Sequence, residues 1–401
     1  MMVGSRIIEL SPSEEERAEE LHERSIIIDT LQSGPAVWND RVYELKRKMI
    51  GSGLPSWLIN ERTRELILEM LAKDEETRQR YVGDIRRSGV TAVNYTVGHR
   101  WKDVSKSFRG AARSFADLIY KIDLFPAALT KAVCADDIVR AKKEGKMAMI
   151  PGFQDTAHLE DNMEVLELFH NLGIRIVQLT YNMGNSVGVG TTERYQDVAG
   201  LSYLGLQLVE KLNELKIVVD TGHCGYRTTL DAVEASKAPV AATHTACRAV
   251  HDYPRGKSDE EIKAIAEGGG YVGIYTVPFF YPKEEMTILH LLDEIDHAVE
   301  VAGSDRVGVG LDYGNQSGPY PEEVGDLIYE SMWSKDVITK YGMAGFRAEH
   351  GVDPRLKVEG IETFQDWPNV TRGLVSRGYS DREIEGILGG NFLKYFQRVV
   401  G

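Results

Sequence analysis

The sequence predicts a TIM-like (β/α)8 barrel with a helical C-terminal extension. Short runs of β-branched and apolar residues alternate with amphipathic stretches, and this alternation implies a parallel sheet. A length of 401 residues fits such a barrel as one domain. Eight strand segments fit a closed barrel better than an open sheet, although periodicity alone leaves a doubly wound sheet possible. The predicted strands cover residues 25–29, 90–98, 147–153, 174–182, 217–223, 239–245, 271–277 and 306–313.

Amphipathic segments separate most of these strands and are expected to be helices. They cover residues 63–89, 104–124, 160–173, 201–216, 229–237, 259–270 and 288–303. The chain after about residue 320 is also expected to be largely helical, and Ser380 and Glu383 there form an S-x-x-E capping box. We therefore expect an N-terminal extension over 1–20 and a single barrel domain over 21–401.

Composition narrows the class of protein. Hydrophobic residues make up 42% of the chain, which supports a packed core. The net charge of -14 disfavours nucleic acid and anionic membranes as partners. No apolar run reaches the roughly 18 residues of a transmembrane helix, and the charged N-terminus has no secretory apolar region. Three scattered cysteines do not suggest a disulfide framework, so the expected location is the cytoplasm.

Three residues near the ends of predicted strands suggest a metal site. His223 and His244 lie at the ends of two successive predicted strands, and Asp312 lies near the end of the last. A single histidine there is more often structural, but the ends of adjacent barrel strands lie close enough for two rings to reach one cation. A carboxylate buried at this rim is costly unless it meets a cation or several donors. Two histidines and a carboxylate are typical of catalytic zinc sites, although Fe(II) sites use the same set.

Other polar residues are candidates for substrate contacts. Arg248 is suited to binding a carboxylate, or alternatively to capping a helix. Tyr181 ends a predicted strand, where its phenol either donates to a developing oxyanion or only lines the pocket. We interpret Arg255 and Asp259 as a structural ion pair. His99 is a spare candidate ligand.

Several segments resemble one protein family in the same order over most of the chain. They include LGIRIVQLTYN, VVDTGH, ATHTACRAVHDYPRGKSDEEIKAIAEGGGYVGI and VEVAGSDRVGVGLDY. From about residue 20 to its end, the chain resembles the membrane (renal) dipeptidase family of metallopeptidases. The resemblance implies a barrel of the metal-dependent hydrolase type that cleaves dipeptides, often as a homodimer. It also implies a binuclear zinc site and, in some members, acceptance of a D-residue at the C-terminal side.

The resemblance assigns roles to four residues. His223 and His244 match the family's two ligands of one metal. Asp312 matches the Asp of the last strand, which is a ligand of the other metal and lies close to the attacking water. Arg248 matches the Arg that holds the substrate carboxylate.

Four positions depart from the family pattern. The first strand carries Leu31 and Ser33 where the family has a His-x-Asp metal pair. Gln154 stands in place of a bridging Glu, and Tyr181 in place of a His that assists at the scissile centre. Leu has no ligand atom, and a neutral Gln does not offset the repulsion between two cations. A full binuclear site is therefore not expected.

These observations predict a mononuclear, zinc-dependent hydrolase of a dipeptide or small amide that carries a carboxylate. His223 and His244 hold the metal, helped by Gln154 or Asp312. Asp312 activates water, Tyr181 acts as acid or oxyanion partner, and Arg248 holds the carboxylate. Two alternatives remain. One is a family member that has lost hydrolysis and binds a small ligand. The other is a barrel enzyme with non-hydrolytic chemistry, such as a lyase or an Fe(II) enzyme.

Overall fold

The computed structural model confirms the predicted barrel. It describes residues 7–98, 107–275, 286–312, 326, 345–350 and 358–401. Eight strands follow one another around the sheet in chain order, each parallel to the next. They are β1 (Ile28–Asp29), β2 (Ala92–Gly98), β4 (Met147–Phe153), β5 (Ile176–Gln178), β6 (Val218–Asp220), β7 (Ala241–Cys247), β9 (Tyr271–Ile274) and β11 (Val307–Val309).

Backbone hydrogen bonds join the first strand to the last. The N–H of Thr30 donates to the carbonyl of Val309 at 3.0 Å, and the N–H of Asp312 donates to the carbonyl of Leu31 at 3.0 Å. The carboxylate of Asp29 reinforces this seam, because its Oδ1 accepts from the N–H groups of Leu31 and Leu311. The sheet therefore closes, which excludes the doubly wound alternative.

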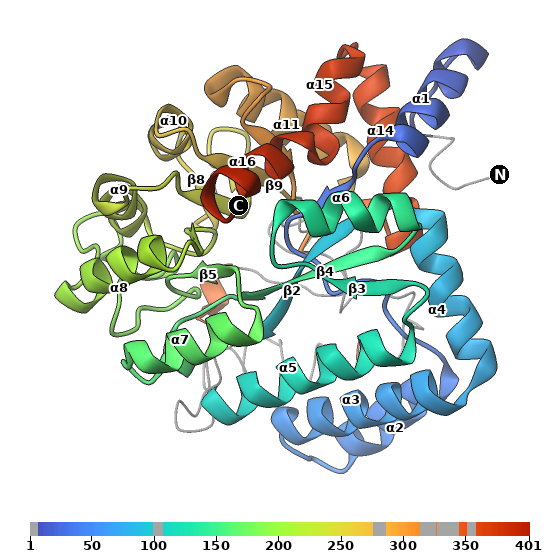
Figure 1. The fold of residues 1–401 in the computed structure, drawn as a ribbon, viewed down its shortest axis with the longest axis horizontal. Coiled ribbons are helices and arrows are strands. Elements are labelled where there is room, and N and C mark those ends of the chain that lie inside the picture. The colour runs from blue at the N-terminus through green and yellow to red at the C-terminus, as the bar shows by residue number, and fades with distance from the viewer. Residues whose placement is uncertain (1–6, 99–106, 276–285, 313–325, 327–344, 351–357) are drawn as a thin grey trace.

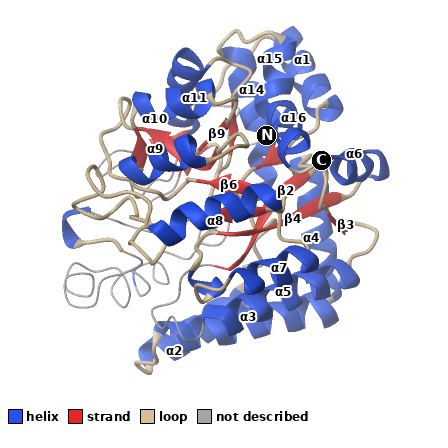
Figure 2. Ribbon diagram, turned by 60° about the vertical axis from the view of Figure 1, so that its left-hand side comes forward, coloured by secondary structure: helices blue, strands red, loops and turns tan. Residues whose placement is uncertain are grey.

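Helices surround the barrel on its outer side (Figures 1 and 2). Those between the strands are α2 (Asp40–Gly51), α3 (Ser56–Lys73), α4 (Glu75–Ser88), α5 (Ser107–Leu124), α6 (Ala135–Glu144), α7 (Met163–Leu172), α8 (Tyr203–Glu214), α9 (Tyr226–Ala235), α10 (Asp259–Glu267) and α11 (Ile288–Ala302). Four short strands lie outside the barrel path: β3 (Leu129–Lys131) pairs with β4, β8 (Gly256–Lys257) with β7, and β10 (Met286–Thr287) with β12 (Val358–Glu359). No helix in the described ranges is both long and apolar enough to cross a bilayer.

The prediction of one helix over 63–89 was wrong, because two helices share this stretch. Asp74 ends α3 and begins α4 with an extended backbone, and its side chain accepts a hydrogen bond from the N–H of Thr77 at 2.9 Å. An aspartate in this position satisfies an N–H that a helix start leaves free, so a new helix begins there. At other ends the prediction was confirmed: Gly173, with φ 123°, follows the last residue of α7.

The C-terminal extension closes the bottom of the barrel. It consists of α14 (Trp367–Ser376), α15 (Asp381–Glu385), a π-helical turn (Gly386–Gly390) and α16 (Asn391–Val399). Phe392 and Phe396 of α16 pack with Ile28, Ala92 and Tyr271, which lie at or near the start of barrel strands. The ring centroids of Tyr271 and Phe392 are 5.1 Å apart. With this end filled, the opposite rim is free to carry a site.

The two ends of the chain pack together on one side of the barrel. Helix α1 (Pro12–Arg24) lies beside α14 and α15 (Figure 1). Arg17 pairs with Asp381 at 2.7 Å, and Glu15 pairs with Arg372 of α14 at 2.6 Å. The predicted domain boundary at residue 20 falls inside this helix. The predicted capping box of Ser380 and Glu383 is confirmed at the start of α15.

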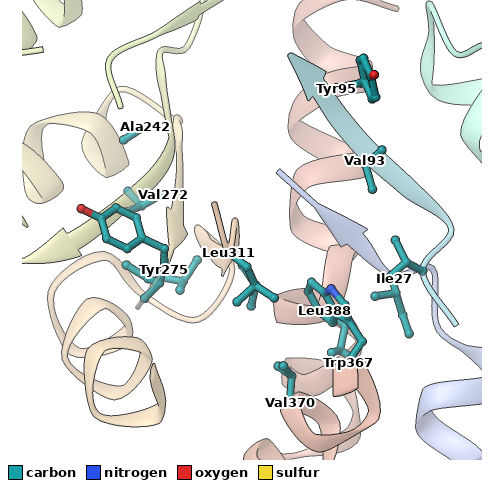
Figure 3. Packing of buried hydrophobic residues seen from close by; sticks show 14 of the residues in the cluster. Ile27, Val93, Tyr95, Ala242, Val272, Tyr275, Leu311, Trp367, Val370 and Leu388 are labelled. Atoms are coloured by element: carbon teal, nitrogen blue, oxygen red, sulfur yellow. The ribbon is translucent and has the colours of Figure 1, made fainter. Parts of the chain in front are cut away.

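A large apolar cluster joins this C-terminal segment to the barrel seam. Leu311, just beyond β11, lies next to Leu388 and Trp367, and Ile27 approaches them from the segment before β1 (Figure 3). All four side chains are buried. The backbone that carries Asp312 is therefore anchored by packing below the rim.

Candidate metal centre

The barrel brings together the three residues predicted to bind metal. One ligand atom from each of His223, His244 and Asp312 lies within 4.8 Å of the other two. His223 follows β6, His244 lies in β7, and Asp312 follows β11. Among the described residues, this is the one group of at least three His, Cys, Asp or Glu side chains arranged closely enough to share a metal ion.

A hydrogen bond orients His223 for metal binding. Its Nδ1 lies 2.6 Å from the amide oxygen of Asn182. Because that oxygen only accepts, Nδ1 carries the proton and Nε2 carries the free lone pair. This Nε2 is buried and has no hydrogen-bond partner in the part of the chain that the structure describes. A buried acceptor without a partner is costly, and a metal ion would satisfy it.

A longer chain of hydrogen bonds orients His244 in the same way. The hydroxyl of Thr243 donates to the carboxylate of Asp220 at 2.6 Å, so it accepts from Nδ1 of His244 at 2.9 Å. Asp220 is held in turn by the backbone N–H groups of Thr243 and Gly222. The Nε2 of His244 is again buried, and none of the described residues forms a hydrogen bond with it. Both histidines therefore present a lone pair fixed by their neighbours, as metal-bound histidines do.

Glycine is required next to these rings. A Cβ on Gly222 would lie 2.9 Å from Cε1 of His244 and 3.0 Å from Oε1 of Gln178. Contacts this short force a neighbour to move, and His244 is held by its hydrogen bond to Thr243. The turn after β6 thus needs a residue without a side chain so that His244 keeps its position.

Burial sets the ionisation of the two histidines. Burial, helped by the nearby Arg255 guanidinium, holds the pKa of His223 and of His244 well below the usual value. Both rings are therefore neutral at pH 7, which is the form that binds a metal.

The third residue of the group, Asp312, has a perturbed carboxylate pKa and a strained backbone. Burial raises its pKa to about 7, and Arg255 opposes that rise. Its backbone lies in the left-handed region, with φ 49°, a conformation uncommon outside glycine and often found at functional sites. A cation nearby would favour the charged form of this carboxylate and offset the cost of burying it.

Tyr181 lies against one of the histidines. Its ring stacks on His223 with centroids 4.2 Å apart and planes 21° apart. Burial, together with the charge of Asp312, raises the pKa of its phenol above the usual value. The phenol therefore stays protonated near neutral pH and can donate a hydrogen bond.

Arg255 belongs to the site, and its interpretation as an ion-pair partner of Asp259 was wrong. Asp259 contacts His297 at 2.8 Å instead. The side chain of Arg255 is buried, donates from Nη1 to the carbonyl of Gly222 at 2.5 Å, and lies over the ring of Tyr275. Its Nε and Nη2 have no hydrogen-bond partner among the residues that the structure describes. Two free donors on a buried cation suit an anionic ligand.

The remaining predicted residues lie at the rim without a settled role. Arg248 is partly buried just after β7, and its carboxylate-binding role stays a prediction. Gln154 follows β4, and its amide nitrogen donates to Thr96 at 3.0 Å, so its ligand role also stays a prediction. Leu31 is buried and Ser33 partly buried. His99 lies outside the described residues.

Comparison with known proteins places this geometry in a family. The model of the membrane dipeptidase family (peptidase family M19) matches residues 15–330. Dipeptidase tcpJ of Claviceps purpurea is 26% identical over 286 residues, which is 71% of this chain and 58% of that protein. Dipeptidase 3 of Mus musculus is 25% identical, over 63% of this chain and 45% of that protein. The chain thus matches only about half the length of these curated relatives.

Solved structures extend the similarity to nearly the whole chain. An amidohydrolase from Pseudomonas aeruginosa is 28% identical with a TM-score of 0.71, over 96% of this chain and 99% of that one. The probable dipeptidase PvdM from the same organism has a TM-score of 0.72 at 20% identity, over 97% and 99% of the two chains. A metallopeptidase from Rhodobacter sphaeroides has a TM-score of 0.67 at 16% identity, over 94% and 99%. The last two show the same fold.

The family match covers most of the chain, includes the barrel strands with His223, His244 and Asp312, and agrees with the solved folds. The chain therefore belongs to the membrane dipeptidase family, peptidase family M19.

Proposed function

We propose that the protein is a metal-dependent hydrolase of a dipeptide or small amide, with one zinc ion held by His223 and His244. One observation carries this proposal: two buried Nε2 atoms have no partner among the described residues, carry lone pairs fixed by Asn182 and Thr243, and lie beside the carboxylate of Asp312. Two imidazoles and a carboxylate are a typical donor set for catalytic zinc.

A single metal suits the first strand as it stands. Leu31 places hydrocarbon where the family resemblance implies a ligand, and it is 2% exposed. Gln154, which stands in place of the family's bridging Glu, supplies no negative charge. A bound zinc ion would activate water and polarise the carbonyl of the substrate. Proton transfer and binding of the substrate carboxylate are roles for residues of the chain itself.

Asp312 and Tyr181 are placed for proton transfer. The carboxylate of Asp312 lies beside the two histidines that would hold the metal, so it can accept a proton from a water molecule bound there. The protonated phenol of Tyr181, stacked on His223, can donate to an oxygen that gains charge during the reaction. Asp312 thus acts as ligand or general base, and Tyr181 as hydrogen-bond donor.

Two arginines are available for a substrate carboxylate. Each of them has a buried Nε without a hydrogen-bond partner among the described residues. Arg255 is the better supported, because its Nη2 is also buried without such a partner and its charge acts on the two histidines and Asp312. Arg248 remains the candidate from sequence. The Rhodobacter metallopeptidase was solved with a phosphinate mimic of the dipeptide L-Ala-D-Ala. Dipeptides with a D-residue in second place therefore belong in the first substrate panel.

Metal analysis of protein purified without added metal tests the proposal. We expect about one equivalent of zinc per chain, lost in His223→Ala and in His244→Ala. Two equivalents would show that the mononuclear assignment is wrong, and no metal under any condition would refute the hydrolase proposal. A protein that holds zinc but cleaves no member of the panel would favour the ligand-binding alternative. A homodimer and a cytoplasmic location stay predictions, the first open to sedimentation analysis and the second to cell fractionation.

A further inference from the structure

A buried ion pair lies beside the proposed metal centre. The ammonium of Lys257, in β8, is 3.1 Å from the carboxylate of Glu261, in α10, and both side chains are only 2% exposed. The ammonium has two further acceptors, the hydroxyl of Thr229 at 2.8 Å and the carbonyl of Cys224 at 3.4 Å. Each of its three N–H groups thus has one partner.

Stability alone does not explain this pair. Burial of two charges costs several kcal/mol per ion, and well-packed apolar residues of similar volume often give equal or greater stability. What an ion pair with three directed hydrogen bonds provides is a defined geometry. It therefore fixes the positions of the groups that it contacts.

The pair fixes the turn that carries His223. The carbonyl just before this histidine, on Gly222, accepts from Arg255, and the carbonyl just after it, on Cys224, accepts from Lys257. Thr229 strengthens the second link, because its hydroxyl also donates to the carbonyl of Gly225 at 3.0 Å. Two buried cations from one short segment therefore hold the backbone on both sides of the ligand.

The segment that supplies these cations is itself held firmly. Gly256 lies opposite Ala246, and Lys257 opposite Cys247, in the pairing of β8 with β7. A Cβ on Gly256 would lie 3.0 Å from the backbone nitrogen of Arg248, so the two strands are in close backbone contact. The segment 255–257 therefore links the end of β7, near His244, to the turn after β6 with His223.

We propose that Lys257, with Glu261 as its counter-ion, is a positioning residue for the metal ligand His223. This inference rests on the proposed metal site. Lys257 acts through the carbonyl of Cys224 and through Thr229, and it does not itself contact the metal or the substrate. Its loss is expected to free the His223 ring from the single orientation that its hydrogen bond to Asn182 defines.

The test removes both charges together, because a single substitution would leave the other charge buried and unpaired. The variant is Lys257→Met with Glu261→Gln. Glutamine keeps the capping box with Ser258, which the Glu261 side chain forms at the start of α10. The matched control is Lys263→Met with Glu267→Gln. This pair has the same spacing of four residues and lies on α10, but its side chains are exposed at 66% and 70%.

Two measurements separate this role from the metal proposal. Nitrogen-15 spectra of the histidines in the metal-free protein report the protonation of Nδ1 and Nε2 in His223. We expect one tautomer, protonated at Nδ1, in wild type and control, and exchange between states in the Lys257 variant. Zinc affinity, measured by competition with a chelator, is expected to fall about 10- to 100-fold in the Lys257 variant and to stay unchanged in the control.

The outcomes are distinct. A folded Lys257 variant with a wild-type His223 spectrum and a zinc affinity within about twofold of wild type overturns the positioning role, while the metal site stands. A wild-type protein that binds no zinc refutes the metal site and this role together. If the Lys257 variant unfolds, the single variant Thr229→Val, which keeps the ion pair, gives the same two readouts and must weaken zinc binding for the role to survive.

Discussion

The clearest consequence for stability concerns His22, a histidine in α1 far from the metal centre. Its ring lies between two segments of the chain, with Nε2 3.0 Å from the carbonyl of Ser88 and Nδ1 2.7 Å from the hydroxyl of Thr371. Burial lowers the pKa of His22 to about 4; the hydrogen bond to Ser88 opposes this shift, and Lys142 adds to it. The folded protein therefore holds this ring in its neutral form.

The sign of the pH effect follows from the direction of this shift. In the unfolded chain His22 binds its proton near pH 6.5, whereas in the folded protein it does so only near pH 4. As the pH falls through this interval, the unfolded state binds more protons and the free energy of unfolding decreases. A difference of about 2.5 pKa units, at about 1.36 kcal/mol per unit, corresponds to a loss of at most about 3.4 kcal/mol. The loss is complete below pH 4.

Urea unfolding of wild type and His22→Gln at pH 7 and at pH 4.2 measures this contribution. Glutamine retains an N–H donor for the carbonyl of Ser88 but does not titrate. Wild type is expected to lose about 2 to 3 kcal/mol more than the variant between these pH values, since other titrating groups act equally on both. Equal losses in the two proteins would refute the assignment of a neutral, buried His22.

Three further predictions concern the barrel and its rim. Gly222→Ala is expected to weaken zinc binding by on the order of tenfold or more, because the new methyl group displaces His244; chelator competition measures it. Thr243→Val removes the hydroxyl that fixes the tautomer of His244, and the same assay should show zinc affinity about 10- to 100-fold lower with the circular dichroism spectrum unchanged. Phe392→Ala leaves a cavity in the packing that fills the bottom of the barrel, and urea unfolding should show a free energy of unfolding lower by about 3–5 kcal/mol. As a control, Gln397→Ala at an exposed position of the same helix should change it by less than about 0.5 kcal/mol.

Most of the barrel was predictable because its strands are buried on both faces. β4, with the sequence MAMIPGF, is buried at every position, and such continuous apolar runs stand out from the amphipathic helices around them. The same rule located the three metal-site residues, since the ends of parallel strands meet at one rim. The break at Asp74 was also readable from sequence, as an aspartate followed by two glutamates is a typical helix start.

Arg255 was not predictable from the same rules. In the sequence it is close to Asp259, and nearby opposite charges suggest an ion pair. The pairing of β8 with β7 brings residues 256 and 257 back to the rim and directs the Arg255 side chain to the carbonyl of Gly222. Two-residue strands carry no periodicity to recognise. The hydrogen bonds of Asn182 and Thr243 to the histidines likewise depend on loop geometry that only the folded chain defines.

The charges around the site favour one metal ion over two. With both histidines neutral, the cations that act on them are Arg255 and Lys257. Because Lys257 is paired with Glu261, the guanidinium of Arg255 and the carboxylate of Asp312 are the described charges that offset each other at the site. One dication therefore leaves an excess positive charge that the carboxylate of a substrate reduces. A second dication would add two more positive charges, and the group of described ligands contains no further carboxylate to balance them. The neutral Leu31, Ser33 and Gln154 are consistent with this balance. We therefore expect metal analysis to find a second zinc ion only after all three are replaced with the family's residues, as Leu31→His, Ser33→Asp and Gln154→Glu.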